Sequence, residues 1–286
     1  MKKIIKLLAA FVAMATVVAC EPVEDRDNLP AKGLEASQIA ITVTHDAVNQ
    51  NLVTMQNNTP GITPYWSYVD SKGNEIGHSN QNNVEVMFPF AGTYKIQFTA
   101  FTRGGGVEAA PVTVTINENN EASFSDPKWD LLTNGTAGKT WVLDMESPIG
   151  WAGFKYPENT ADPDGWNWFP DYAGNSWVMP NKNWGEMTFD LNGAYNVNVI
   201  QTALEDDTQT NRSGSFSFNI AANTMSFNGA AELLHGGDYY LDASNWRSLK
   251  VVELTEGSLR LSVVRDQSRK AEDPCQIVFH FKPKQQ

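Results

Sequence analysis

The sequence predicts an all-β protein built from two β-sandwiches, and three observations lead to that prediction. Short runs of β-branched and aromatic residues recur along most of the 286 residues, with glycine, proline, asparagine and aspartate between them. The helical spacing of apolar residues is almost absent. Turn sequences at residues 190–194 and 255–258 join neighbouring runs, as in β-hairpins.

The first twenty residues have the pattern of a secretory signal. Lys2, Lys3 and Lys6 precede an apolar run over residues 7–18, and Val-Val-Ala stands directly before Cys20. This run is too short to cross a bilayer of about 30 Å as a helix, so we expect a cleaved signal. Its ending resembles the lipobox of bacterial lipoproteins, which implies removal of residues 1–19 and a lipid anchor on Cys20. The alternative is an ordinary signal peptide with a chance cysteine.

Charge and composition limit the location and the partners of the chain. Residues 20–35 are predicted to be a flexible tether, because they lack an apolar pattern and begin with an acid-rich stretch. An acidic stretch after a lipidated cysteine resembles the signal that exports some lipoproteins to the outer face of the outer membrane. The net charge of −12 and the pI of about 4.8 argue against a nucleic-acid partner.

Residues 36–117 are predicted to form the first sandwich. Alternation over residues 93–99 places Tyr94, Ile96 and Phe98 on one buried face. The segment resembles a PKD-type immunoglobulin-like domain, because Trp66 stands in an early strand, a turn follows at 71–74, and Pro-Phe-Ala-Gly-Thr-Tyr precedes a long strand. It departs from that family where an Asp-Gly turn usually follows the tryptophan. The resemblance implies a spacer domain with Trp66 in its core. The expected strands are 39–44, 65–69, 84–88, 92–100 and 111–116.

Residues 118–126 are polar and unpatterned, and we expect them to be an interdomain linker. Residues 127–286 suffice for a larger second sandwich. A short helical turn is expected at 129–132. The expected strands are 140–144, 185–191, 194–201, 214–220, 224–227, 249–255, 258–265 and 276–282.

An aromatic loop interrupts the second domain. Five of the nine tryptophans lie between residues 151 and 184, among glycine, proline, asparagine and aspartate. This loop composition does not fit one amphipathic face packed on a core. Flat aromatic faces on irregular backbone suit a sugar-binding surface, because the axial C–H groups of a pyranose lie against the electron-rich face of an indole. The candidate glycan-binding residues are Trp151, Trp166, Trp168, Trp177, Trp184, Tyr172, Asn167 and Asp164.

The other tryptophans of the domain have structural interpretations. Trp141 lies in an expected strand and is predicted to point inward, while Trp129 and Trp246 are assigned to packing. One or two tryptophans of the loop are also expected to pin it to the domain and not to contact ligand. Cys275 lies in an apolar run and is predicted to be a buried small hydrophobe.

The sequence offers no clear catalytic centre. Hydrolysis of a glycan needs two carboxyls about 5 to 9.5 Å apart. Glu186 and Asp190 would share a face of one strand, but four strand residues span roughly 13 Å. The four histidines show no metal-ligand spacing, and no serine-hydrolase elbow is present. We expect no cofactor. A calcium ion that clamps the acidic stretch at 162–164 or at 206–207 is kept as an alternative.

Lipidated start, acidic tether, spacer and tryptophan-rich β domain together resemble the surface glycan-binding lipoproteins of polysaccharide-utilisation loci. The resemblance rests on residues 138–144, 165–168, 249–254 and 259–261 of this sequence. It implies a second domain like a carbohydrate-binding module, non-catalytic capture of a polysaccharide, and a TonB-dependent transporter complex as partner in the outer membrane. A β-glucan such as laminarin or mixed-linkage glucan is the expected ligand by this analogy. The alternatives are a surface endo-glycosidase and a protein-binding adhesin or spacer.

Overall fold

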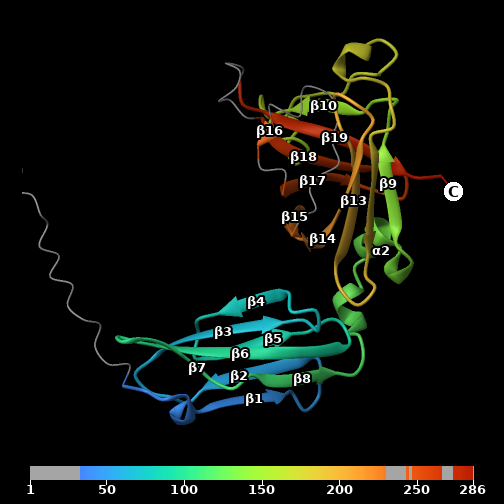
Figure 1. Ribbon diagram of the computed structural model, residues 1–286. Coiled ribbons are helices and arrows are strands. Elements are labelled where there is room, and N and C mark those ends of the chain that lie inside the picture. Colours follow the sequence, from blue (N-terminus) through green and yellow to red (C-terminus); the bar gives the residue numbers. More distant parts are fainter. Residues whose placement is uncertain (1–32, 230–242, 245–246, 266–272, 286) are drawn as a thin grey trace, which may run out of the picture. The chain divides into compact units, whose positions relative to one another are not determined.

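The computed structural model describes residues 33–229, 243–244, 247–265 and 273–285 (Figure 1). The predicted signal, Cys20, most of the tether and Trp246 lie outside the described residues. The prediction of an all-β protein is confirmed, since 48% of the structure is strand and 8% is helix. In the part of the chain that the structure describes, none of the helices is long and apolar enough to cross a membrane.

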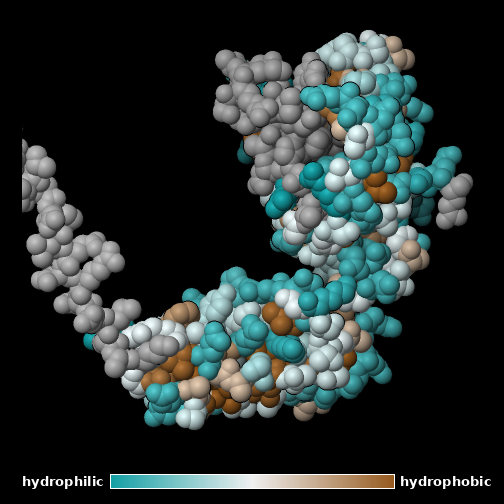
Figure 2. Space-filling model, in the orientation of Figure 1, coloured by the Kyte–Doolittle hydropathy of each residue, from teal (hydrophilic) through white to brown (hydrophobic). Residues whose placement is uncertain are grey.

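The described residues form two compact units, and neither is continuous in sequence. Unit 1 contains residues 33–44, Thr54–Val86 and Tyr94–Val114. Unit 2 contains His45–Val53, Met87–Thr93 and residues 115–285. On the face shown in Figure 2, both units are mostly teal and white, and brown side chains are gathered in separate patches.

The N-terminal strands form two antiparallel sheets. One has the order β1 (Ile41–His45), β2 (Leu52–Asn57), β5 (Asn83–Met87). The other has the order β4 (Glu75–Ser79), β3 (Thr63–Val69), β6 (Gly92–Thr102), β7 (Gly105–Glu108), and β8 (Val112–Ile116) also pairs with β6. A 3₁₀ turn, η2 (Ala36–Gln38), precedes β1.

The core of these sheets follows the sequence pattern. Tyr94, Ile96 and Phe98 are buried, as the alternation predicted. Trp66 is fully buried and donates its indole N–H to the carbonyl of Gln81 at 3.0 Å. Strands β2, β4 and β7 are additions to the prediction. β4 and β7 contain glycine, and β2 ends in asparagine beside further asparagines at 49, 51 and 58, so local composition favours turns there when no neighbouring strand is considered.

The second predicted sandwich is wrong in its architecture, because this part of unit 2 is a closed eight-stranded barrel. Each strand pairs antiparallel with the next, and the last strand pairs with the first through Phe281 and Leu143. Closure leaves no free edge in the ring. The eight strands are β9 (Lys139–Leu143), β12 (Gly185–Asp190), β13 (Asn196–Thr202), β14 (Gln209–Asn219), β15 (Thr224–Gly229), β17 (Ser248–Leu254), β18 (Leu259–Arg265) and β19 (Gln276–Pro283).

The interior of the barrel is filled with side chains. Trp141 is fully buried there, and Phe189 makes ring contacts with Phe216 at 5.2 Å and with Phe227 at 5.9 Å. This filling is what an eight-stranded barrel of large apolar residues should show. Cys275 and Trp129 are also buried, as predicted. Three further 3₁₀ turns belong to unit 2: η3 (Glu121–Phe124), η4 (Gly135–Ala137) and η5 (Ser176–Val178).

Helix α2 (Lys128–Thr133) closes one end of the barrel. The Trp141 indole N–H donates to the carbonyl of Leu132 at 3.0 Å, and this hydrogen bond attaches the helix to a side chain of the barrel interior. Lys128 Nζ reaches Asn223 Oδ1 in the β14–β15 turn at 2.8 Å, and Lys139 Nζ bridges the carbonyls of Leu131 and Glu256. Glu256 lies in the β17–β18 turn. The β14–β15 and β17–β18 turns lie at the end of the barrel where β9 begins, so α2 covers this end.

Two short strands extend the barrel at the end opposite to α2. Figure 1 shows α2 at one end of the barrel and β10 at the other. β10 (Ile149–Ala152) pairs with the first half of β19, whose second half pairs with β9. β11 (Asn167–Trp168) then pairs with β10. A further short strand, β16 (Ala243–Ser244), pairs with the last residues of β18. We call this end, where β12 and β19 begin and β13 ends, the barrel mouth.

Candidate functional site

Three indoles meet at the barrel mouth. Trp151 in β10 lies opposite Ile277 of the barrel, so it has the orientation of an interior residue, and Trp168 in β11 lies opposite Trp151. The ring centroids are 5.1 Å apart for Trp151 and Trp168, 6.4 Å for Trp151 and Trp177, and 6.1 Å for Trp168 and Trp177. The ring planes differ by only 17° to 24°. Because the three separations are similar, the rings form an offset triangular cluster and not a linear column.

The outer members of this cluster are accessible to solvent. Trp177 is 55% exposed and Trp168 is 45% exposed, whereas Trp151 is buried beneath them. Trp166 is 44% exposed, and its carbonyl accepts a hydrogen bond from Gly153 N at 2.9 Å, which continues the β10–β11 ladder. Residues two apart on a strand point to the same side, so Trp166 and Trp168 share a face. Large apolar side chains so exposed on one loop are a feature of binding surfaces.

Polar groups on the outer wall of the barrel hold the first part of this loop. Gln276 in β19 donates to the carbonyls of Gly153 and Tyr156 at 2.6 and 2.9 Å, and it accepts from Ser262 at 2.8 Å. Lys250 in β17 donates to the carbonyl of Tyr156 at 2.7 Å. The buried amide and the ammonium therefore bind loop carbonyls that lie outside the strand ladders.

Phe169 anchors the segment that carries Trp166 and Trp168. Its ring lies over Gly150, where an added Cβ would stand 2.2 Å from a ring carbon, so only glycine admits this packing. The guanidinium of Arg260 is 5.0 Å from the ring centroid, and the ring of His280 packs against it edge to face at 4.8 Å. Burial, and then the charge of Arg260, lower the pKa of His280 to about 4. His280 is therefore neutral at physiological pH.

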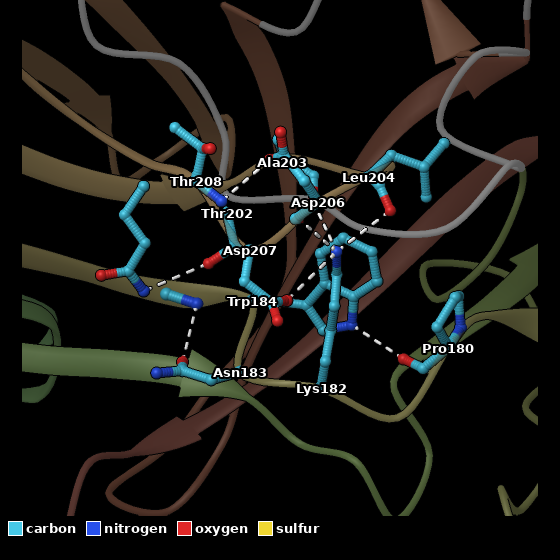
Figure 3. A network of polar contacts seen from close by, with 12 residues as sticks. Pro180, Lys182, Asn183, Trp184, Thr202, Ala203, Leu204, Asp206, Asp207 and Thr208 are labelled. Carbon is cyan, nitrogen blue, oxygen red and sulfur yellow. Dashed lines mark hydrogen bonds and ion pairs between the residues drawn. The ribbon is translucent and has the colours of Figure 1, made fainter.

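Lys182 fixes the other end of the loop, as Figure 3 shows. Its ammonium donates to the carbonyls of Ala203, Leu204 and Asp206 in the β13–β14 turn, the last two at 3.0 Å. It also lies 4.5 Å from the ring centroid of Trp184. Trp184 is buried and donates its indole N–H to the carbonyl of Pro180 at 3.1 Å. Trp184 thus belongs to the attachment of the loop and presents no face to a ligand.

The remaining predicted site residues differ in what they can contribute. The Tyr172 hydroxyl donates to the carbonyl of Met179 at 2.9 Å, which fixes the loop from within. Asp164 Oδ2 accepts from Phe154 N at 3.1 Å, so this carboxylate shapes a turn. Asn167 is exposed beside the tryptophans. The structure therefore brings Trp166, Trp168, Trp177 and Asn167 to the surface. Trp151 stacks beneath Trp168 and Trp177, while Trp184 and Tyr172 fix the loop through hydrogen bonds to its own carbonyls.

Several supporting residues have no signal in the sequence. Gln276 and His280 occupy outward positions of β19, where a barrel strand normally meets solvent, and both are buried because the loop covers them. Arg260 and Lys250 lie on the same wall. The one available clue is that polar residues alternate with apolar ones in β19, which predicts an outer face but not a covered one.

Carboxylates at the barrel surface are engaged in structural contacts. Glu186 pairs with Lys284, and Asp190 accepts from Asn196 Nδ2 at 2.7 Å and from Asn192 N at 2.9 Å. Among the described residues, no group of three or more histidine, cysteine, aspartate or glutamate side chains could hold a metal ion.

No family model matches the sequence, and a search of curated proteins found no match.

Proposed function

We propose that this chain is a non-catalytic polysaccharide-binding protein whose binding surface is the group of exposed indoles at the barrel mouth. One observation carries the proposal: Trp166, Trp168 and Trp177 each keep about half of their surface accessible on a loop that is fastened to the barrel at both ends. Indoles without a ligand would be expected to pack inward, because exposing large apolar area to water is unfavourable.

The attachments of the loop suit a binding role. Gln276, Lys250 and Phe169 fix the backbone before and after Trp166 and Trp168, and Lys182 fixes the segment after Trp177. A pre-ordered surface loses little conformational entropy when it binds a ligand. Buried Trp151 supports Trp168 and Trp177 by offset stacking, so these two rings can each offer a flat face to a pyranose.

The affinity of each sugar contact would be modest. A stacked sugar contributes on the order of 1 kcal/mol, so three or four contacts give micromolar to millimolar dissociation constants. Many copies on one cell surface that face a long polymer would raise the effective affinity well above that of one site. Weak sites on many copies therefore suffice for capture.

The cellular setting of the proposal comes from the sequence. The signal ending at Cys20 supports a lipid anchor, and the acidic stretch after it supports the outer face of the outer membrane. The N-terminal sheets would serve as a PKD-type immunoglobulin-like spacer. A TonB-dependent transporter complex is the proposed partner and a β-glucan the proposed ligand, both by the family resemblance alone. The strongly acidic chain does not suit nucleic acid.

Affinity gel electrophoresis tests the proposal. The chain from residue 21 onward is run through a series of native gels, each of which contains one polysaccharide. The polysaccharides are laminarin, barley β-glucan, xyloglucan, galactomannan, xylan and starch. We expect retardation in at least one gel, strongest for a β-glucan, without release of reducing ends. Release of reducing ends would identify the endo-glycosidase alternative. Free migration in every gel would overturn the proposal and favour a protein partner.

A further inference from the structure

The outer face of the β4-β3-β6-β7 sheet in unit 1 carries a second group of aromatic rings. His78 in β4, Tyr65 in β3 and Phe101 in β6 lie on three adjacent strands. The rings of Tyr65 and His78 are stacked with centroids 5.7 Å apart and planes 25° apart. The Phe101 ring meets Tyr65 edge to face at 6.3 Å. The three rings therefore form a continuous row across the sheet.

This row is open to solvent. Phe101 is 47% exposed, and the side chain of His78 is 62% exposed. On the next strand, Gly106 lies beside Phe101, where an added Cβ would stand 3.2 Å from a ring carbon. The Phe101 ring therefore lies against this glycine, in space that a larger residue would crowd. These rings lie on the outward face of the sheet, since the buried core is formed by the opposite face.

Directional polar groups adjoin the rings. Glu75 Oε1 lies 2.8 Å from His78 Nδ1, and Glu75 Oε2 accepts from the Ser67 hydroxyl at 3.1 Å. The carboxylate is therefore held in place next to the Tyr65 and His78 stack. Thr99 lies opposite Tyr65 in the register and is partly exposed. Aromatic faces beside a fixed carboxylate and a hydroxyl offer both stacking and hydrogen bonds.

We propose that this aromatic row is a second saccharide-binding surface, occupied by another segment of the same polysaccharide. Flat rings beside fixed hydrogen-bonding groups match a sugar, which presents C–H faces and hydroxyls at short intervals. Three partly exposed rings and the exposed Ile76 are few compared with the roughly 20 to 30 residues a side of a stable protein interface. This inference rests on the proposed function, because it takes its ligand class from the barrel mouth.

Isothermal titration of the chain from residue 21 onward with a short oligosaccharide separates the two surfaces. The oligosaccharide is taken from the polysaccharide that retards the protein in gels and is too short to reach both surfaces at once. We expect two oligosaccharides per chain. Tyr65→Ala combined with Phe101→Ala is expected to reduce this to one, and Trp168→Ala combined with Trp177→Ala is expected to do the same. With the long polymer, each double variant should bind at least about fivefold more weakly.

Thr93→Ala is the matched control, because Thr93 lies in β6 with the outward parity of Phe101 and is exposed near the other end of the strand. It should leave both the stoichiometry and the melting temperature unchanged. One oligosaccharide per chain, lost only in the Trp168 and Trp177 double variant, would overturn this inference and leave the proposed function intact. Binding lost only in the Tyr65 and Phe101 double variant would support the second surface and contradict the barrel mouth.

Discussion

Two groups of tryptophans in the barrel unit differ in the contacts that they make. Trp141 and Trp184 are buried, and each donates its indole N–H to a backbone carbonyl. Each also has a lysine two residues earlier whose ammonium lies over its ring, at 4.3 and 4.5 Å from the centroid. Trp168 and Trp177 are held by parallel rings and keep about half of their surface in water. The same side chain thus supports the fold at one position and offers a surface at another.

This difference shows that local composition does not decide the role of an indole. Trp177 and Trp184 are seven residues apart in the same loop, and asparagine and proline residues stand near both of them. What separates them is the neighbouring structure, because Trp184 directly precedes β12 and is covered by Lys182, which is fastened to the β13–β14 turn. Stability should therefore depend on the buried group, and glycan affinity on the exposed group.

The largest effect is expected from Trp141→Ala. Removing a fully buried indole from the barrel interior leaves a cavity and should lower the free energy of unfolding by about 3–5 kcal/mol. Urea denaturation followed by far-UV circular dichroism measures this change. Trp166→Ala is the matched control and should cost less than about 1 kcal/mol, because its side chain is half exposed. Similar losses in the two variants would break the distinction between the groups.

Lys182→Met should give the next largest effect. The ammonium satisfies three converging carbonyls, and its loss leaves them without that donor, at a cost of about 2–3 kcal/mol. Differential scanning calorimetry should show a lower melting temperature, and gel retardation should weaken with it because the loop loses an attachment. Lys95→Met, at an exposed position of β6, is the control and should change neither. A Lys182 variant as stable as the parent would remove the lysine from the account of loop attachment.

Acid should weaken the attachment of the loop through His280. The folded protein keeps His280 neutral down to about pH 4, whereas the unfolded chain protonates it near 6.5. The unfolded state therefore binds more protons between these values, so this contribution is complete above pH 6.5 and falls as the pH drops. We expect a loss of about 2 kcal/mol between pH 7 and pH 5.

Urea unfolding at a series of pH values measures this dependence. His280→Gln should flatten the change between pH 7 and pH 5, whatever its effect on absolute stability, whereas His78→Gln, at an exposed position of β4, should retain it. An equal slope in the parent and in His280→Gln would show that another group titrates.

The smallest free-energy change is expected at the exposed rings. Trp168→Ala and Trp166→Ala should each weaken binding of the retained polysaccharide at least several-fold, since one stacked sugar contributes about 1 kcal/mol. Their melting temperatures should change little. Affinity electrophoresis at several polymer concentrations gives the ratio of dissociation constants. Unchanged affinity, or collapse of the fold, would assign these residues to packing.

Much of the fold follows from local sequence. Every strand predicted in the second domain is present, with ends that differ by a few residues, and helix α2 covers the predicted turn at 129–132. The hairpin turn at 255–258 is present, with Thr255 N bonded to the carbonyl of Ser258 at 2.8 Å. Alternation and turn residues encode these features, because they act between neighbours in the chain.

Closure of the barrel could not be predicted in this way. A sandwich and a barrel share the same alternating strands and hairpins, and they differ here in the pairing of Leu143 with Phe281, which are remote in sequence. Strands β10 and β11 escaped prediction because each is short and rich in glycine or loop residues. The candidate site was predicted as five tryptophans with three polar neighbours. Which of the five indoles are buried depends on contacts with β19 and with the β13–β14 turn, and one sequence does not reveal these contacts.

The central claim is that the exposed indoles bind polysaccharide while the buried indoles hold the barrel. The most direct test is affinity electrophoresis of the Trp168→Ala and Trp177→Ala double variant beside the parent chain, in the gel that retards the parent most, with a thermal melt of both proteins. The account predicts markedly reduced retardation of the variant at a nearly unchanged melting temperature. Full retardation of a folded variant would contradict it, because the exposed rings would then make no contribution to binding.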